Sequence, residues 1–171
     1  AMGSRLLSRW INRPLRQRSQ LLLRQQAVAA LKSDYHFEAL HEVLQNIGDL
    51  ERIIARLGLR SARPRDLAKL RDGLAQLPEL QQQLSTMTAT SISEIAQRIR
   101  EFPQQSALLA RALEENPPVV IREGGVVATG YDAELDELRN LSSNAGQYLI
   151  DLEVREKERT GIATLKVGYN R

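Results

Sequence analysis

Apolar residues recur at spacings of three and four along most of this chain, the pattern of helices that bury one face. Prolines fall between these stretches, where they end one helix or begin the next. The pattern predicts helices over 3–12, 19–32, 35–46, 50–59 and 64–84, the last of them bent or restarted at Pro78, a short helix that holds Ile95 and Ile99, and a helix over 106–115. Most of the chain is therefore expected to be a multi-helix bundle, and the fold class mainly α.

Two short stretches carry a β pattern instead. Apolar runs at 119–121 and 126–128 flank a glycine-containing turn, which predicts a small β-hairpin near 119–128. At the end of the sequence, apolar and polar residues alternate over 163–170, as in a half-buried strand. We therefore expect a terminal strand at 163–170, with no following strand in this sequence to pair with.

The range 131–160 is predicted to be one long helix that protrudes beyond the bundle. Its apolar stripe consists of Leu138, Leu141, Ala145, Tyr148 and Leu152. The stripe ends near Val154, and the next five residues are all charged, so this end is expected to stand in water. At 1.5 Å per residue such a helix would be about 45 Å long.

Acid–base pairs four residues apart are expected to support the exposed end of this helix. Asp151 precedes Arg155 by four residues, and Glu153 precedes Lys157 by four. Each pair has the favourable orientation and is expected to contribute about 0.2–0.5 kcal/mol. An exposed helix end stabilised by ion pairs accounts for these charges without any binding partner.

Composition and charge narrow the class of protein. Aromatic residues make up 4% of the chain, so its core must come from aliphatic side chains, and the absence of cysteine excludes disulfides. The net charge of +3 conceals a polarity: residues 1–75 hold 14 bases and 7 acids, whereas residues 114–160 hold 11 acids and 5 bases. The basic half is compatible with nucleic acid, with an acidic neighbour, or with a solvated helical face.

No constellation of residues in the sequence indicates catalysis. His36 and His41 would lie roughly 140° apart on a helix, too far round to share a metal easily. Neither a phosphate-binding glycine loop nor a nucleophile with its base occurs, and adjacent acids such as Glu114 and Glu115 fit exposed helical positions. No apolar run approaches the roughly 20 residues of a membrane span. An enzyme of unrecognised type is the least favoured class.

Three stretches of the sequence are similar to one known family. They read GDLER at 48–52 with ARPRDL at 62–67, GGVVATGYDAELD at 124–136, and EKERTG at 156–161 with TLKVGYN at 164–170. In this order they resemble the bacterial MutS mismatch-repair proteins. The resemblance implies a helical core or lever domain over 1–153 and the beginning of a clamp domain over 154–171.

The resemblance also implies a function for the parent protein. MutS proteins are dimeric DNA-binding ATPases that close on mismatched double-stranded DNA and recruit MutL, so we expect a homodimer in the bacterial cytoplasm, associated with the nucleoid. This chain is expected to be a fragment in which the lever couples nucleotide binding to the clamp, with no catalytic activity of its own. ATP and magnesium are expected only in a separate ATPase domain.

The clamp of the family is expected to contact phosphates without reading bases. The candidates for DNA-backbone contact are Lys157, Arg159, Lys166 and Asn170. Solvated side chains without a partner are the alternative at each position. For the chain as a whole, the alternative function is a stand-alone helical scaffold that binds another protein through its apolar grooves.

Overall fold

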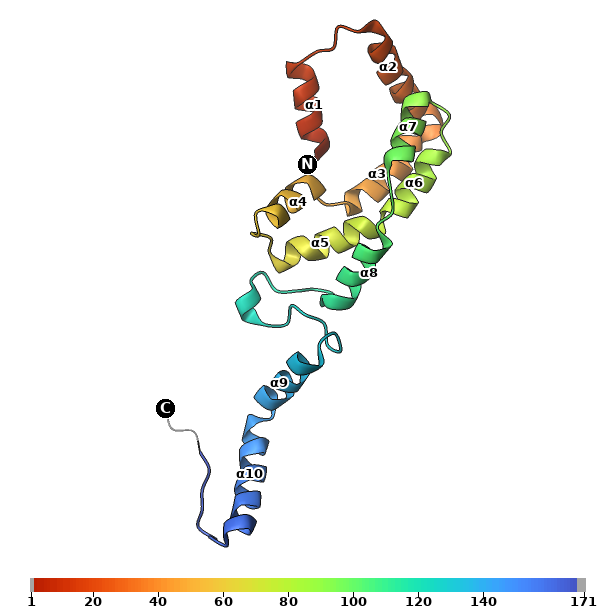
Figure 1. Cartoon of the computed structure of the whole chain (residues 1–171). Coiled ribbons are helices and arrows are strands. Elements are labelled where there is room, and N and C mark those ends of the chain that lie inside the picture. The colour runs from red at the N-terminus through yellow and green to blue at the C-terminus, as the bar shows by residue number, and fades with distance from the viewer. Residues whose placement is uncertain (1, 169–171) are drawn as a thin grey trace. The chain divides into compact units, whose positions relative to one another are not determined.

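The structure, a computed structural model, describes residues 2–168 and is mainly helical, as predicted (Figure 1). Its elements in chain order are α1 (Met2–Asn12), α2 (Arg18–Lys32), η1 (Ser33–Tyr35), α3 (His36–Asn46), α4 (Leu50–Gly58), α5 (Pro64–Ala75), α6 (Leu77–Ser85), α7 (Thr90–Arg98), α8 (Pro103–Ala112), η2 (Ile121–Glu123), α9 (Ala133–Ser143) and α10 (Ala145–Thr160). The chain forms two compact units, Ala1–Ala128 and Thr129–Arg171.

Several helices begin where local chemistry favours a start. Asp49 caps α4, because its side chain accepts a hydrogen bond from the backbone N–H of Arg52 at 3.3 Å. Pro64 is the first residue of α5, where its missing N–H costs nothing. Pro78 lies in the first turn of α6 and separates that helix from α5. The helical range predicted over 64–84 therefore restarts at Pro78, one of the two outcomes expected there, and forms two helices.

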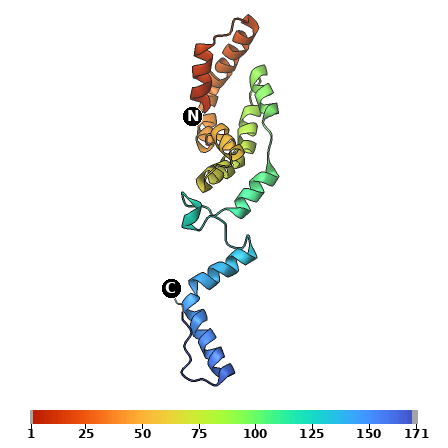
Figure 2. The same ribbon diagram turned by 60° about the vertical axis from the view of Figure 1, so that its left-hand side comes forward.

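The main core of the first unit lies among α2, α3, α6 and α7, which pack against one another. Figure 2 shows these elements from a second direction. The buried side chains of this core are Leu40, Val43, Leu80, Leu84, Met87, Ile92 and Ala96. All are aliphatic or thioether groups, as the low aromatic content predicts. Burial of these side chains provides the hydrophobic stabilisation of this unit.

Helices α4, α5 and α8 form a second packed group in the first unit. Ile53 of α4 is 3% exposed, and Ala68 of α5 is buried as well. Gly73 lets α5 approach α4 closely, since a Cβ atom at this position would lie 3.0 Å from Leu50 Cδ2. A glycine inside a helix is explained here by packing rather than by a turn.

The β-hairpin predicted near 119–128 is wrong. Residues 121–123 form the short helix η2, and no strand occurs within residues 2–168. The second apolar run pairs with the end of α8 instead: Leu113 and Val127 form an isolated antiparallel bridge, and the Glu114 N–H donates to the Val126 carbonyl at 3.0 Å. This tertiary pairing takes the backbone groups that a hairpin would need.

The long helix predicted over 131–160 is also wrong in part. The helical region starts at Ala133 and is interrupted at Asn144, whose backbone (φ −104°, ψ 17°) departs from helical geometry. The side chains of serine and asparagine compete for backbone hydrogen bonds, and the Ser143 hydroxyl does so by donating to the Asn140 carbonyl at 3.1 Å. Figures 1 and 2 show α10 continuing onward from α9 after a bend. We call residues 133–160 the α9–α10 arm.

The terminal strand predicted over 163–170 is not supported. Residues 163–164 form a turn, in which the Leu165 N–H donates to the Ile162 carbonyl at 3.2 Å, and residues 165–168 have no regular secondary structure and pair with no strand among the described residues. Residues 169–170 lie outside the described range. A strand requires a neighbour for its ladder of hydrogen bonds, and the described part of the second unit offers only the helices α9 and α10.

Candidate nucleic-acid interface

The candidate interface lies along the second half of α10, where Glu153 joins the helix to the segment that follows it. Its Oε1 accepts from Lys157 Nζ at 2.6 Å, and its Oε2 accepts from the Val167 N–H at 3.3 Å. The hydrogen bond from Lys157, followed by that from Val167, holds the pKa of Glu153 below its ordinary value. Glu153 thereby fixes the residues after α10 alongside the helix.

A second ion pair and a glycine end the helix. Arg159 Nη2 lies 2.7 Å from Glu156 Oε2, and this contact lowers the pKa of Glu156 and raises that of Arg159. Gly161 adopts φ +69°, and its N–H donates to the Lys157 carbonyl at 2.9 Å. This left-handed conformation is the usual helix stop, and glycine adopts it without strain.

The candidate DNA-contacting residues differ in whether their side chains already bind a carboxylate. Lys157 and Arg159 already bind carboxylates, although the Arg159 side chain is 70% exposed. Lys166 is exposed and has no ion pair within residues 2–168, although Glu153 lies near enough to sense its charge. Asn170 lies outside the described residues. Lys166 is therefore the base in this group that is most available to a phosphate.

One of the two predicted acid–base pairs forms and the other does not. Glu153 and Lys157 pair as expected, whereas Asp151 accepts a hydrogen bond from Gln147 Nε2 at 2.9 Å. No ion pair between Asp151 and Arg155 is found among the described residues. The amide four residues before Asp151 competes with the base four residues after it. The Glu156–Arg159 pair, spaced by three, was missed, although acid–base spacing of this kind is a recognisable signal.

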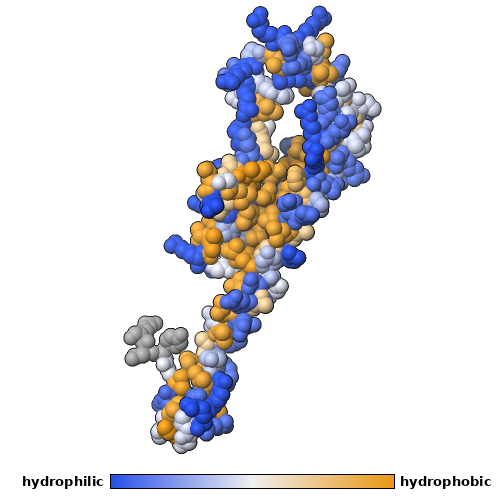
Figure 3. Space-filling model, in the orientation of Figure 1, coloured by the Kyte–Doolittle hydropathy of each residue, from blue (hydrophilic) through white to orange (hydrophobic). Residues whose placement is uncertain are grey.

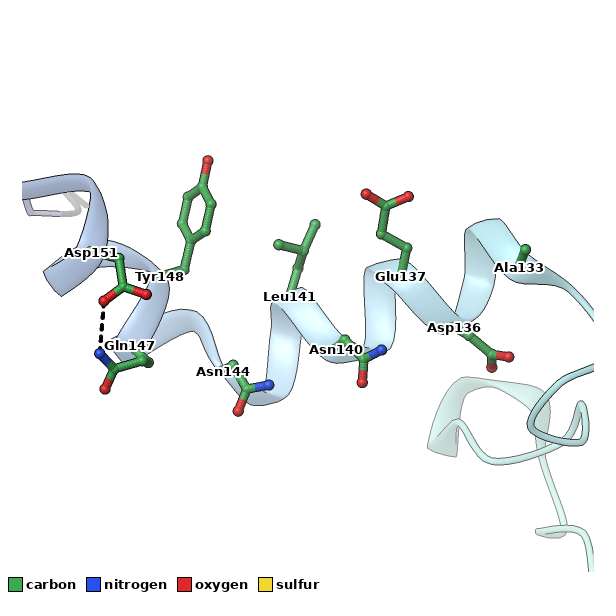
Figure 4. A pocket seen from close by; sticks show the side chains of 9 residues that line it. All are labelled: Ala133, Asp136, Glu137, Asn140, Leu141, Asn144, Gln147, Tyr148 and Asp151. Carbon is green, nitrogen blue, oxygen red and sulfur yellow. Dashed lines mark hydrogen bonds between the residues drawn. The ribbon is translucent and has the colours of Figure 1, made fainter. Parts of the chain in front are cut away.

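A shallow groove of about 800 Å³ runs along one side of the α9–α10 arm (Figure 4). Its lining residues are Ala133, Asp136, Glu137, Asn140, Leu141, Asn144, Gln147, Tyr148 and Asp151. The predicted apolar stripe is exposed along the arm, with Leu138 at 57%, Leu141 at 43% and Tyr148 at 48%. Within residues 129–168, no helix other than α9 and α10 is present to cover this stripe.

Helix α1 is attached to the rest of the first unit by contacts of charged side chains, which the hydrophobic periodicity of the sequence did not reveal. Arg5 binds both carboxylate oxygens of Asp49 at 2.6 and 2.7 Å and reaches Glu51 at 2.8 Å. The hydrogen bond from Arg5 holds the pKa of Asp49 well below its usual range. The guanidinium of Arg24 lies 3.7 Å from the ring centroid of Trp10, a cation–π contact between α2 and α1. Asp49 thus serves as both helix cap and anchor for α1.

Two arginines of α5 hold the chain that leaves α8. Arg71 donates to the carbonyls of Glu114 at 3.1 Å and Glu115 at 3.0 Å, and Arg65 donates to the carbonyl of Pro117 at 3.3 Å. These contacts span more than forty residues of sequence. They fix the extended backbone against which residues 126–128 pair.

Neither histidine takes part in a cluster that could hold a metal. Within residues 2–168 no group of three or more His, Asp or Glu side chains has a suitable arrangement. His41 lines a groove between α1 and α3, and His36 begins α3. In the same residues, no helix has both the length and the apolar character needed to cross a membrane.

Comparison with protein-family models agrees with the resemblance seen in the sequence. MutS domain III matches residues 1–158, which include all of the helices described above except the last two residues of α10. MutS domain III is a part of DNA mismatch-repair proteins. The chain therefore belongs to the MutS family.

Proposed function

We propose that this chain is the mechanical part of a DNA mismatch-recognition ATPase and has no catalytic activity of its own. In this role the α9–α10 arm couples a nucleotide-binding domain to a clamp that holds DNA. A helix can transmit displacement because its hydrogen-bonded backbone shifts or rotates as a unit rather than deforming. The supporting observation is that α9 and α10 follow one another in series, with the end of α10 stabilised by ion pairs instead of burial.

We propose that the clamp end of this unit contacts DNA phosphates through Lys166, with Lys157 and Arg159 adding to the positive charge. Lys166 is exposed, and the Glu153–Val167 hydrogen bond fixes the backbone next to it. A phosphate contact provides affinity without sequence information. Asn170 is kept as a candidate on sequence grounds alone.

Substitution of Lys166 tests this contact. Lys166→Ala should weaken binding to matched and mismatched duplex by the same factor and should lower the salt slope by about one. Thr164→Ala, an exposed neighbour in the same segment, is the control and should leave binding unchanged. A loss confined to mismatched DNA would mean that Lys166 takes part in recognition of the lesion rather than in backbone contact.

The coupling role requires a test in a full-length MutS protein that carries this domain III sequence. Replacing Asn144 and Ala145 by glycine should loosen the bend without touching either end of the arm. We expect mismatch binding to persist while ATP no longer alters the clamp. A variant that still responds to ATP like the original protein would exclude a role for the arm as a stiff transmitter.

The remaining parts of the proposal concern partners. DNA and a second protein copy are general partners of the MutS family. We propose that ATP with magnesium acts in a separate domain and that MutL is a downstream partner.

The second candidate function is a protein-binding scaffold, which the exposed apolar side chains of Leu138 and Tyr148 favour. Retention of a protein partner after nuclease treatment would support the scaffold.

A further inference from the structure

The beginning of the chain has an unusual charge distribution. Residues 1–33 contain seven arginines or lysines and no acid, and Asp34 is the first acidic residue. Because the whole chain has a net charge of only +3, the remaining residues are net negative. The positive charge of this protein is therefore concentrated in α1, α2 and the turn between them.

Four of these bases lie within ten residues at that turn. Arg9 lies in the last turn of α1, Arg13 and Arg16 lie between the helices, and Arg18 is the first residue of α2. All four are exposed, and none has an ion pair within residues 2–168. Figure 3 shows a mainly hydrophilic surface with side chains projecting from this turn. We call residues 9–18 the basic turn.

The basic turn is held in place by contacts that leave its own charges unused. Arg24 stacks on Trp10 and so connects α2 with α1. Arg5 ties α1 to Asp49 of α4. The Asn12 amide also donates to the Ser8 carbonyl at 2.8 Å at the end of α1. The turn therefore presents its guanidinium groups from a fixed base rather than from a loose tail.

The charges near the start of α2 do not complement the positive end of its helix dipole. Helix α2 has no acid in its first turn, and its N-cap Gln17 makes no side-chain hydrogen bond to the helix. Arg18 instead places a positive charge at the positive end of the helix dipole, and three other arginines precede it within ten residues of sequence. A ligand with several negative charges would relieve this repulsion.

We propose that the basic turn binds the phosphate backbone of duplex DNA without regard to sequence. Arginine suits phosphate oxygens because its planar group donates two parallel hydrogen bonds. The exposed apolar residues Leu7 and Ile11 lie on a face of α1 roughly 160° from Arg9, whereas Leu6, Leu21 and Leu22 are exposed within one helical turn of Arg9 or Arg18. Four arginines within ten residues, with no acid among them, fit the closely spaced charges of a phosphate backbone. This site lies in the first unit and is separate from Lys166 in the second.

The test compares two variants of equal net charge. The first carries Arg9→Gln, Arg13→Gln, Arg16→Gln and Arg18→Gln. The control carries Arg52→Gln, Arg98→Gln, Arg100→Gln and Arg122→Gln, which are exposed positions in the same unit. Fluorescence anisotropy with a fully matched duplex of about 30 base pairs, at salt concentrations from about 50 to 200 mM, gives the affinity and the salt slope of each.

We expect the basic-turn variant to lose at least about tenfold in affinity at low salt and two to four units of salt slope, because each phosphate contact contributes about 0.9. The control should change about twofold or less. The double variant Arg13→Gln with Arg16→Gln, outside both helices, should lose about one to two units of slope even if the fourfold variant fails to fold. In a chain that carries Lys166→Ala, the basic-turn substitutions should still lower the duplex affinity and the salt slope by the same amounts. This result separates the proposal from the Lys166 contact proposed above.

Three results would overturn the proposal. The first is a chain with no measurable duplex affinity at low salt. The second is an equal loss in the control variant, which would mean that net charge alone matters. The third is poly-glutamate binding that depends on the basic turn while duplex binding does not, which would identify an acidic protein segment as the partner.

Discussion

The carboxylate of Glu153 accepts the backbone N–H of Val167 at 3.3 Å, so a side chain in the middle of α10 holds the chain that comes after the helix. The other oxygen of the same carboxylate binds Lys157 at 2.6 Å. Figures 1 and 2 both show the following segment running beside α10. The position of the neighbouring Lys166, the exposed candidate for phosphate contact, therefore depends on the Glu153 carboxylate.

Replacing that acid should release the segment. In Glu153→Ala the Val167 amide loses its acceptor, and we expect its hydrogen exchange to become about three- to tenfold faster. Amide exchange measured by NMR checks this. Glu158→Ala, in the same exposed end of α10, is the control. Unchanged exchange at Val167 in Glu153→Ala would mean that the turn at 162–165 fixes the segment by itself.

Acid should have the same effect as the substitution. The hydrogen bond from Lys157 holds the pKa of Glu153 below its ordinary value of 4.5, so the carboxylate stabilises the folded arrangement above that pH. The stabilisation should disappear as the pH falls through the lowered pKa. NMR titration of the Glu153 carboxyl and the Val167 amide should show them changing together. Independent titration of the two signals would argue against the contact.

Two glycines of α10 should respond in opposite ways to alanine. Gly146 has open space at its Cβ position and no positive φ, so Gly146→Ala should stabilise the helix by about 0.5–1 kcal/mol. Gly161 has φ +69°, so Gly161→Ala should destabilise by roughly 1 kcal/mol. Thermal unfolding followed by circular dichroism measures both. Equal effects of the two substitutions would contradict the assigned helix end.

Removal of the Arg5 side chain should loosen the attachment of α1 to the rest of the first unit. Helix α1 has no buried residue, and Arg5 provides its link to Asp49 and Glu51 of the α4 region. In Arg5→Ala we expect faster hydrogen exchange and proteolysis within α1, with α3 and α6 unchanged. Arg9→Ala removes an exposed arginine from the same helix and should have no such effect. Equal protection of α1 in both variants would show that Trp10 and Arg24 suffice.

Local signals predicted much of this fold. Asp49 and Pro64 begin helices as their chemistry indicates, and Gly161 ends one. The wrong hairpin near 119–128 has a different origin: the partner of Val127 is Leu113, and Arg71 holds the backbone around it from another helix. Periodicity contains no information about such tertiary pairing.

The candidate interface was predictable only where acids and bases are close in sequence. The spacing of Glu153 and Lys157 predicts their ion pair, but nothing local indicates that the same carboxylate would also bind Val167. The break at Asn144 had a local signal, since two serines and an asparagine in succession are poor helix formers. The long apolar pattern on both sides concealed it.

The most direct test concerns the α9–α10 arm as a single stiff element. The chain has no cysteine, so Glu137→Cys and Glu158→Cys allow two spin labels to be placed on exposed positions of α9 and α10. Double electron–electron resonance should give one narrow distance distribution near or slightly below about 30 Å, the length expected for two helices in series with a bend. A broad distribution, or a short distance from helices folded back on each other, would contradict the arm as a transmitter.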